Sequence, residues 1–444
     1  MRVLHVPFGF YPSPQGGTEV YVAALANALQ ALGVTSLIAA PGERNETYEW
    51  AGLSVHRFGT SPDAALAGLY GEGDPTAAAE FGRILDRVRP DLVHFHALTA
   101  GASVLAMREV KTRRIPLIFT YHTPTVSCVR GTMMKWGRIP CDGLMDARLC
   151  GACALHAKGM PKIVSLAMAS MPTKPMVGIG RILGSGRLAT AAQIPALVSM
   201  RHAATRTAFE ISDHVVAVCG WVRDALRANG VPAEKVALNR QGFLGEISAL
   251  DPDEVSDAAS PACFSSTEPL RMAYFGRLDP TKGVHVVVEA VRMQAGLPVT
   301  LDVFGISQGA GGERYREQLA CLAAGDSRIK FHDAVGSGAV VELMCQYDLI
   351  VIPSLCLETG PLVVLEAFAA GTPVIGSRLG GIAELVHGGV DGVLVDAADV
   401  GAWANAIGVL AASPSRLHAL RAGVKPPRQM AVVAQEMMKV YQNA

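Results

Sequence analysis

Two carboxylates in the last quarter of the chain have the type and spacing of a ligand site. Glu358 and Glu366 are separated by seven residues, and between them the pair Gly360-Pro361 opens an apolar run. Because proline is favoured in the first turn of a helix, we predict a strand over 349–353, a loop, and a helix from about Pro361. The start of a helix suits an anion such as a diphosphate. The two carboxylates can then flank one ligand, and paired ribose hydroxyls would give a carboxylate two donors.

Two cations occupy a loop of the same half of the chain. Arg277 and Lys282 lie between a predicted strand over 270–275 and the helix that follows. Arginine grips a phosphate as a fork and lysine acts on it as a point charge. This pair therefore predicts a second set of contacts to a diphosphate.

A glycine pair follows the first predicted strand, at 2–7. Gly16-Gly17 precede a helix with an apolar stripe, and no GxGxxG fingerprint or P-loop is present. Glycine at such a turn lets a backbone approach a ligand closely. A glycine pair alone is a weak signal, so we favour a simple tight turn, and a role in ligand binding stays open.

Strands and helices alternate in both halves, which predicts an α/β fold with parallel, doubly wound sheets. Ligands of such sheets lie outside the carboxyl ends of the strands. His96 and His122 both end predicted strands there. Each is either a hydrogen-bonded structural histidine or a ligand contact. We favour the structural reading for His96 and the functional one for His122.

The length of 444 residues suggests two or three domains. A polar, acidic, proline-bearing stretch has the composition of a domain boundary. We predict a Rossmann-like domain over 1–248 with an insertion at about 124–206, a linker over 249–268, a second Rossmann-like domain over 269–426, and a C-terminal helix over 427–444 that crosses back to the first domain.

Composition excludes several classes of protein. Lysine plus arginine and aspartate plus glutamate number 39 each, so no net charge points to nucleic acid. Pro7 and Pro12 interrupt the N-terminal apolar stretch, so we expect no signal peptide, and no run of about 18 apolar residues predicts a spanning helix. Nine cysteines, an odd number, favour a reducing compartment, and we expect the cytoplasm.

Four cysteines gather after His122: Cys128, Cys141, Cys150 and Cys153, of which the last two form a C-x-x-C pair. Four thiolates can hold one tetrahedral zinc ion. A structural zinc, reduced free thiols and a redox pair are the three readings, in decreasing order of preference.

A basic segment follows the cysteines. No aspartate or glutamate occurs between Asp146 and Glu210, and an apolar run lies at 163–171. The segment contains the cations Arg148, Lys158, Lys162, Lys174, Arg181, Arg187, Arg201 and Arg206. We expect an irregular segment that either lies on an anionic membrane surface or covers an acceptor cleft.

Taken together, the chain resembles the retaining nucleotide-sugar glycosyltransferases of family 4. The resemblance rests on Gly16-Gly17, on GRLDPTKG at 276–283 and on ETGPLVVLE at 358–366. It implies the GT-B architecture, in which two doubly wound Rossmann-like domains face a central cleft. The first domain would bind the acceptor and the second the nucleotide sugar.

The resemblance also implies roles for single residues. Arg277, Lys282 and the N–H groups around Pro361 would hold the diphosphate, and Glu366 would take the ribose hydroxyls. Glu358 and His122 would lie against the donor sugar. The implied catalytic residues are His122, Glu358, Arg277 and Lys282. The implied donor-binding residues are Gly16, Gly17, Arg277, Lys282, Glu358, Thr359, Gly360, Pro361, Leu362 and Glu366.

The implied reaction moves a sugar from a nucleotide-diphosphate sugar, the co-substrate, to an acceptor hydroxyl with retention at the anomeric carbon. No catalytic metal is expected, because the cations take its place. The acceptor would be a sugar or lipid-linked sugar in polysaccharide or glycolipid assembly, at the inner face of the membrane. His122 is followed by Thr123 where the family usually has aspartate. A nucleotide-sugar epimerase and a non-catalytic nucleotide-sugar binder of the same architecture are the alternatives.

Overall fold

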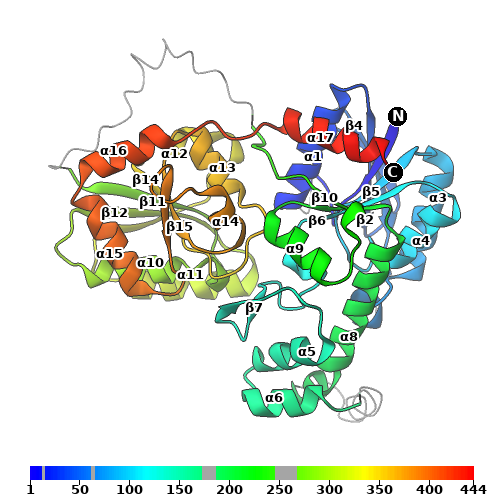
Figure 1. Ribbon diagram of the computed structural model, residues 1–444, viewed down its shortest axis with the longest axis horizontal. Coiled ribbons are helices and arrows are strands. Elements are labelled where there is room, and N and C mark those ends of the chain that lie inside the picture. Colours follow the sequence, from blue (N-terminus) through cyan, green and yellow to red (C-terminus); the bar gives the residue numbers. More distant parts are fainter. Residues whose placement is uncertain (13–15, 62–65, 173–186, 246–267) are drawn as a thin grey trace. The chain divides into compact units, whose positions relative to one another are not determined.

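The structure is a computed structural model that describes residues 1–12, 16–61, 66–172, 187–245 and 268–444 (Figure 1). Its internal contacts divide the chain into two compact units. Unit 1 comprises Met1–Gln241 and Met430–Ala444, and unit 2 comprises Gly242–Gln429. The C-terminal segment therefore returns to the unit that contains the N-terminus.

Unit 1 is built on an eight-stranded sheet with the order β10-β9-β6-β5-β1-β2-β4-β3. Its strands are β1 (Arg2–Val6), β2 (Thr35–Gly42), β3 (Glu46–Trp50), β4 (Leu53–Gly59), β5 (Leu92–Phe95), β6 (Leu117–Tyr121), β9 (His214–Ala217) and β10 (Val236–Leu238). All pairings are parallel except that of β3 with β4 at one edge. Strand order reverses between β1 and β5, so the loops after these strands are where a ligand is expected.

Helices pack on this sheet through apolar stripes. They are α1 (Gly17–Gln30), α2 (Leu66–Tyr70), α3 (Pro75–Val88), α4 (Val104–Thr112), α9 (Gly220–Ala228) and α17 (Met430–Gln442). Asp74 caps α3 by accepting from the N–H of Thr76, and Pro75 opens that helix. The last helix, α17, packs against α1 and buries Val433 and Met437.

The segment that was expected to be irregular is mostly helical, so that prediction was wrong. Where the structure describes this basic segment, it contains α5 (Ala147–His156), α6 (Lys162–Ala169) and α8 (Arg187–Ile211). The part of the insertion that precedes it contains η1 (Pro124–Val126), β7 (Met134–Lys135) and β8 (Ile139–Pro140). Asp146 caps α5, and alanine and leucine dominate the helices, which favours helix despite Pro195 inside α8. Figure 1 shows α5 and α6 beside one end of α8, where Leu155, Ile194 and Val198 form a separate small core.

Unit 2 has a six-stranded parallel sheet with the order β13-β12-β11-β14-β15-β16. Its strands are β11 (Leu270–Arg277), β12 (Val299–Ile306), β13 (Ile329–His332), β14 (Leu349–Ile352), β15 (Val374–Ser377) and β16 (Gly392–Val395). The order reverses between β11 and β14. The loops that follow these two strands carry Arg277 and Lys282 on one side and Glu358 on the other, at the expected ligand position of such a sheet.

Helices cover both faces of the unit 2 sheet. They are α10 (Val284–Met293), α11 (Gly309–Ala323), α12 (Val340–Met344), α13 (Leu362–Ala369), α14 (Gly380–Leu385), α15 (Val400–Ala411) and α16 (Pro414–Gly423). One apolar core contains residues of α10, α11 and α15, including the buried Trp403. A second core contains residues of α12, α13 and α14. Two separate cores confirm the predicted doubly wound α/β fold.

Candidate functional site

The two loops at the switch point of unit 2 are locked together by backbone contacts. After β11 the turn η4 (Pro280–Lys282) ends at Gly283, which has φ +72°. A Cβ atom on Gly283 would lie 2.0 Å from the carbonyl oxygen of Pro353. Next to this contact, Leu355 donates its N–H to the carbonyl of Thr281 at 2.7 Å. Only glycine satisfies both the left-handed conformation and this close approach, so the loops are held in a fixed relation.

An ion pair joins the two loops through their side chains. The Nζ of Lys282 lies 2.5 Å from Oε1 of Glu358, and the Oγ of Ser354 donates to the same oxygen at 2.7 Å. Burial acts to raise the pKa of Glu358, but Lys282 and Ser354 outweigh it and the pKa is lowered. Burial acts to lower the pKa of Lys282, but Glu358 outweighs it and the pKa is raised. Both side chains are therefore charged.

Arg277 brings a second cation to this pair. Its side chain is exposed, and its guanidinium has no hydrogen-bond partner within the described ranges. Its charge nevertheless contributes to the lowered pKa of Glu358, so the two are close enough to interact. The Tyr274 hydroxyl donates to the backbone carbonyl of Arg277 at 2.7 Å and fixes the end of β11. Two cations and one carboxylate thus meet at the switch point.

The helix start predicted near Pro361 is present. Pro361 is the N-cap of α13, whose helical residues begin at Leu362. The N–H groups of a first helical turn lack acceptors four residues back and can bind an anion. One turn in, Glu366 is partly buried, and its carboxylate has no partner among the residues whose structure is described. Burial raises the pKa of Glu366, because nothing compensates the loss of water.

A second glycine pair at this site was missed by the sequence reading. The N–H of Gly381 donates to the carbonyl of Glu358 at 2.7 Å. Gly380 has φ +48°, and a Cβ atom there would lie 2.9 Å from the same carbonyl oxygen. These glycines therefore hold the loop that carries Glu358 and the buried Thr359. The available signal was a Gly-Gly pair separated by two residues from the end of the apolar strand β15.

The glycine pair of unit 1 has a local explanation. Gly16 is the N-cap of α1 with an extended φ of −151°, and Gly17 is the first helical residue. A Cβ atom on Gly16 would lie 2.9 Å from Oε2 of Glu19. Burial raises the pKa of this carboxyl group. Hydrogen bonds from backbone N–H groups, including those of Gly9 and Gly16, lower it by less, so the net shift is upward. Gly16 therefore makes room for Glu19, a residue that the sequence reading missed although it follows the glycines at a helix start.

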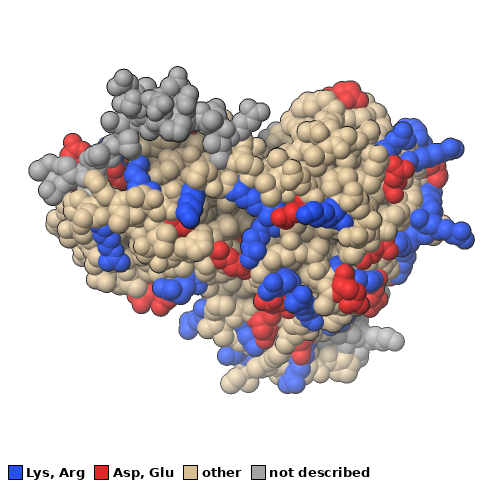
Figure 2. All heavy atoms as spheres, turned by 45° about the horizontal axis from the view of Figure 1, so that its top comes forward, with Lys and Arg blue, Asp and Glu red and all other residues tan. Residues whose placement is uncertain are grey.

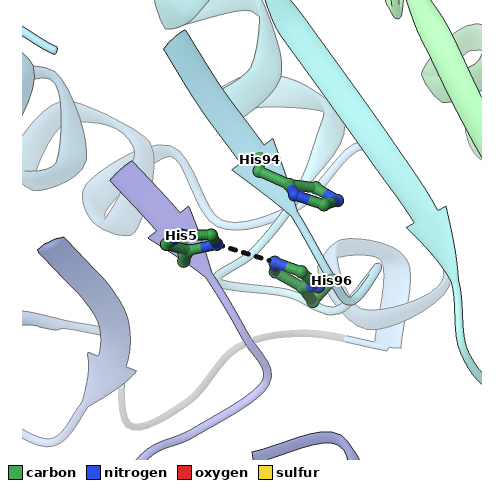
Figure 3. A group of neighbouring side chains, drawn as sticks. All are labelled: His5, His94 and His96. Carbon is green, nitrogen blue, oxygen red and sulfur yellow. Dashed lines mark hydrogen bonds between the residues drawn. The ribbon is translucent and has the colours of Figure 1, made fainter. Parts of the chain in front are cut away.

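His96 and His122 directly follow the carboxyl ends of β5 and β6, and their side chains meet there. The Nδ1 of His96 lies 3.0 Å from Nε2 of His122, and both rings are buried. Two further histidines, which the sequence reading missed, join them: His5 from β1 and His94 from β5 (Figure 3). Because β1, β5 and β6 are neighbours in the sheet, histidines near their ends could have been grouped once the strand order was known.

The four cysteines lie in one region but do not converge. Cys128 follows η1, Cys141 follows β8, and Cys150 and Cys153 lie on α5; all four are free thiols. Burial and the other three sulfurs raise the pKa of Cys150 to about 12. The Sγ of Cys153 accepts hydrogen bonds from Arg130 and from the N–H of Trp136, both at 3.3 Å. Across the described ranges only His5, His94 and His96 have three ligand atoms mutually within 4.8 Å, so the thiols are spaced more widely.

The hypothesis of a membrane-bound basic segment requires its cations to be exposed, but some of them are not. Arg201 is buried and donates to the carbonyls of Leu98 and Thr125, and Arg206 donates to that of Met145. Lys158 and Lys162 are exposed. Lys174, Arg181 and the side chain of Arg187 lie outside the described residues.

Helix α6 exposes apolar residues beside the exposed lysines. Ile163 is 83% exposed and Val164 is 43% exposed. The ammonium group of Lys162 lies 4.8 Å from the centre of the Trp136 ring. Within the ranges that the structure covers, every helix is too short or too polar to cross a membrane.

The sequence matches two family descriptions. Residues 16–242 match the "Glycosyl transferase 4-like domain", and residues 269–413 match "Glycosyl transferases group 1". A D-inositol 3-phosphate glycosyltransferase of Corynebacterium urealyticum is 34% identical over 145 residues, which are 31% of this chain and 34% of that protein. The chain thus matches about a third of that relative's length.

Solved structures share the fold over the whole chain. The sucrose-phosphate synthase of Thermosynechococcus elongatus has a TM-score of 0.65 at 19% identity and covers 100% of this chain and 98% of its own. The Anabaena protein HepE, solved in complex with UDP-glucose, has a TM-score of 0.63 at 18% identity, with 100% of both chains covered. These similarities confirm the predicted GT-B architecture.

Proposed function

The chain belongs to the family-4 glycosyltransferases, and on that premise we propose that it transfers a sugar from a nucleotide-diphosphate sugar to an acceptor hydroxyl with retention at the anomeric carbon. The observation that carries this proposal is the combination found at the switch point of unit 2. Arg277 ends β11 and Lys282 lies in the turn after it, while α13 follows the loop after β14 and carries Glu366, whose carboxylate has no partner among the described residues. The cations and the helix start suit the diphosphate of such a donor, and the carboxylate of Glu366 suits its ribose hydroxyls.

The chemistry proposed for the cations is electrostatic. When the bond to the sugar breaks, negative charge grows on the leaving diphosphate. Arg277 and Lys282 stabilise that charge together with the N–H groups of the first turn of α13. Because Glu358 keeps Lys282 charged in a partly buried position, the cation is in place before the donor binds. These groups supply what a catalytic metal would otherwise supply.

The two carboxylates are proposed to bind the other parts of the donor, the ribose and the sugar. Glu366 lacks a partner in the described structure and accepts hydrogen bonds from the ribose hydroxyls. Glu358 pairs with Lys282 and lies on the loop held by Gly381, and in this proposal it contacts the sugar. In this proposal His122 of unit 1 contacts the same sugar, and Gly17 lets the first loop close over it.

A thermal-shift panel tests the proposal without knowledge of the acceptor. The full chain is heated with nucleoside diphosphates and their sugar derivatives in the presence of EDTA. We expect one base to raise the melting temperature, with a further change when its sugar is attached. Stabilisation without any consumption of the sugar donor would favour a non-catalytic binder, and conversion of the donor to its epimer would favour an epimerase.

A structural zinc ion is proposed for Cys128, Cys141, Cys150 and Cys153. The two N–H groups that point at the sulfur of Cys153 support it, since such bonds stabilise a thiolate. Binding requires the sulfurs to approach one another, because a zinc–sulfur bond is about 2.3 Å long.

Purified protein is expected to contain one zinc per chain by elemental analysis. Replacement of Cys150 by serine should remove the metal and lower the melting temperature, whereas replacement of the remote Cys321 should change neither. Metal-free protein with full activity and unchanged melting would identify the four cysteines as ordinary thiols.

Attachment to an anionic membrane surface is proposed for α6 and the loop before it. Lys158, Lys162 and the exposed Ile163 and Val164 present charge and apolar surface together. Elsewhere charges of both signs are interspersed, as the face drawn in Figure 2 shows. Each engaged lysine contributes about 1 kcal/mol near an anionic bilayer, within a Debye length. This location at the cytoplasmic face would suit a lipid-linked sugar acceptor.

Vesicle flotation is expected with anionic but not neutral lipids, and high salt should abolish it. The variant with Lys158, Lys162 and Lys174 changed to glutamine should float less. A control variant with three other cations changed, Arg227, Arg314 and Lys330, should float like the original protein. Equal flotation on both lipids, or on neither, would instead support a cover over the acceptor site and a soluble acceptor.

A further inference from the structure

A row of three buried histidine rings leads from the centre of the unit 1 sheet to His122. The Nδ1 of His5 lies 3.1 Å from Nε2 of His96, and the Nδ1 of His96 lies 3.0 Å from Nε2 of His122. Figure 3 shows the first of these bonds, between β1 and the end of β5. None of the three residues is more than 4% exposed, so the row is almost entirely shielded from bulk water.

All three rings are neutral at physiological pH. Burial lowers the pKa of His5 and of His122 to about 3. Burial and the neighbouring histidines lower the pKa of His96 well below its usual value. A neutral imidazole carries one N–H and one lone pair, so each bond in the row needs a donor on one side and an acceptor on the other.

These bonds couple the tautomers of the three rings. If Nδ1 of His5 donates, Nε2 of His96 must accept, and the proton of His96 is then on Nδ1. That nitrogen donates to Nε2 of His122, which leaves the proton of His122 on Nδ1. The opposite direction places all three protons on Nε2. A mixed row would set two protons or two lone pairs against each other in a site without water.

A metal ion is the competing explanation for this cluster, since His5, His94 and His96 have ligand atoms within 4.8 Å of one another. Among the described residues, however, every ring nitrogen of these three histidines except Nε2 of His5 already has a hydrogen-bond partner. Nδ1 of His94 bonds the Tyr441 hydroxyl at 2.7 Å, and its Nε2 bonds Oγ1 of Thr120 at 2.6 Å. Both nitrogens of His96 lie within the row. A metal would have to break these bonds, so the contacts favour a hydrogen-bonded row.

We propose that His5 and His96 are positioning residues that fix the ring orientation and the tautomer of His122, and that all three histidines share one tautomer. The inference rests on the proposed contact of His122 with the donor sugar. Neither positioning residue touches the substrate. Their effect reaches the sugar through His122, whose side chain must offer a defined donor or acceptor for a directional hydrogen bond.

The tautomers can be read directly from the full-length protein. In nitrogen-15 spectra of histidine-labelled protein, protonated and unprotonated ring nitrogens have well-separated shifts. His5, His96 and His122, assigned by single replacements, are expected to show the same protonated nitrogen. Different tautomers among the three, or loss of their N–H signals on addition of Zn²⁺, would overturn the proposal.

Replacement of His5 by phenylalanine tests the functional consequence. The row loses its far end, so the shifts of His122 should move toward a mixture of tautomers. Turnover should fall by about ten- to a hundredfold, the range seen when a partner that orients a ligating histidine is lost. The control is Tyr441→Phe, which removes a buried bond to His94 but leaves the row intact. It should keep both the shifts of His122 and the turnover.

The two proposals can fail separately. Unchanged turnover and unchanged His122 shifts in His5→Phe would refute the positioning role. If His5→Phe does not fold, the spectra of the unmodified protein still decide whether the tautomers agree. If the unmodified protein processes no nucleotide sugar while the tautomers agree, the proposed function fails and the coupled row stands.

Discussion

Replacement of Lys282 by methionine is expected to lower sugar-donor turnover by about two to three orders of magnitude, as when one charge-stabilising donor is removed from an active site. Lys282 is already charged and held by Glu358 at 2.5 Å, so it is a preorganised cation. The variant also leaves the partly buried Glu358 without its ion-pair partner, so a loss of stability should accompany the loss of turnover.

Arg277→Ala separates these two effects. Its guanidinium is exposed and has no hydrogen-bond partner among the described residues, so its removal should affect the unfolding transition much less than the loss of Lys282. Turnover should still fall about as far as for Lys282, because the same diphosphate charge loses a donor. The matched control is Arg314→Ala, which removes an exposed arginine that bonds the carbonyl of Ala310 in its own helix. Near-normal turnover in both site variants would refute the assignment of these cations to the diphosphate.

Replacement of Glu366 by alanine is expected to weaken the binding of free nucleoside diphosphate as strongly as that of the full donor. Hydrogen bonds to a charged group contribute about 1.5–3 kcal/mol, so Kd should rise about ten- to a hundredfold for either ligand. The fold should persist, since the carboxylate of Glu366 has no partner to lose among the residues described.

Glu358→Ala should affect the two ligands unequally in calorimetric titrations. The full donor should lose more affinity than the free diphosphate, because the proposed partner of Glu358 is the sugar. Melting should fall, since Lys282 loses the charge that keeps it ionised. Replacement of the exposed Glu342 provides the control. Equal losses for both ligands in both site variants would contradict the division of roles between the two carboxylates.

The sequence predicted those parts of the fold that depend on local rules. Pro361 marks the start of α13 because proline is favoured at the beginning of a helix, and the apolar strands followed from their composition. The edge strand β3 was missed because Glu46–Trp50 is polar and pairs only with β4. The helices of the insertion were missed because glycine and proline in that stretch obscured the alanine-rich segments.

The contacts of the site depend on strand order, which local patterns do not contain. Lys282 and Glu358 are 76 residues apart in sequence and meet because β11 and β14 are neighbours. His5 and His96 are 91 residues apart and meet because β1 pairs with β5. The residue types at the site were therefore predictable, whereas the ion pair and the histidine row became visible only in the structure.

The anomeric configuration of the released sugar tests the central claim most directly. The full chain is incubated with the nucleotide sugar selected by the thermal-shift panel, in EDTA, and the first product is followed by proton magnetic resonance before it mutarotates. The account predicts release of nucleoside diphosphate and a sugar with the configuration of the donor, both lost in Arg277→Ala. An inverted product, a strict requirement for metal, or turnover that survives in Arg277→Ala would contradict it.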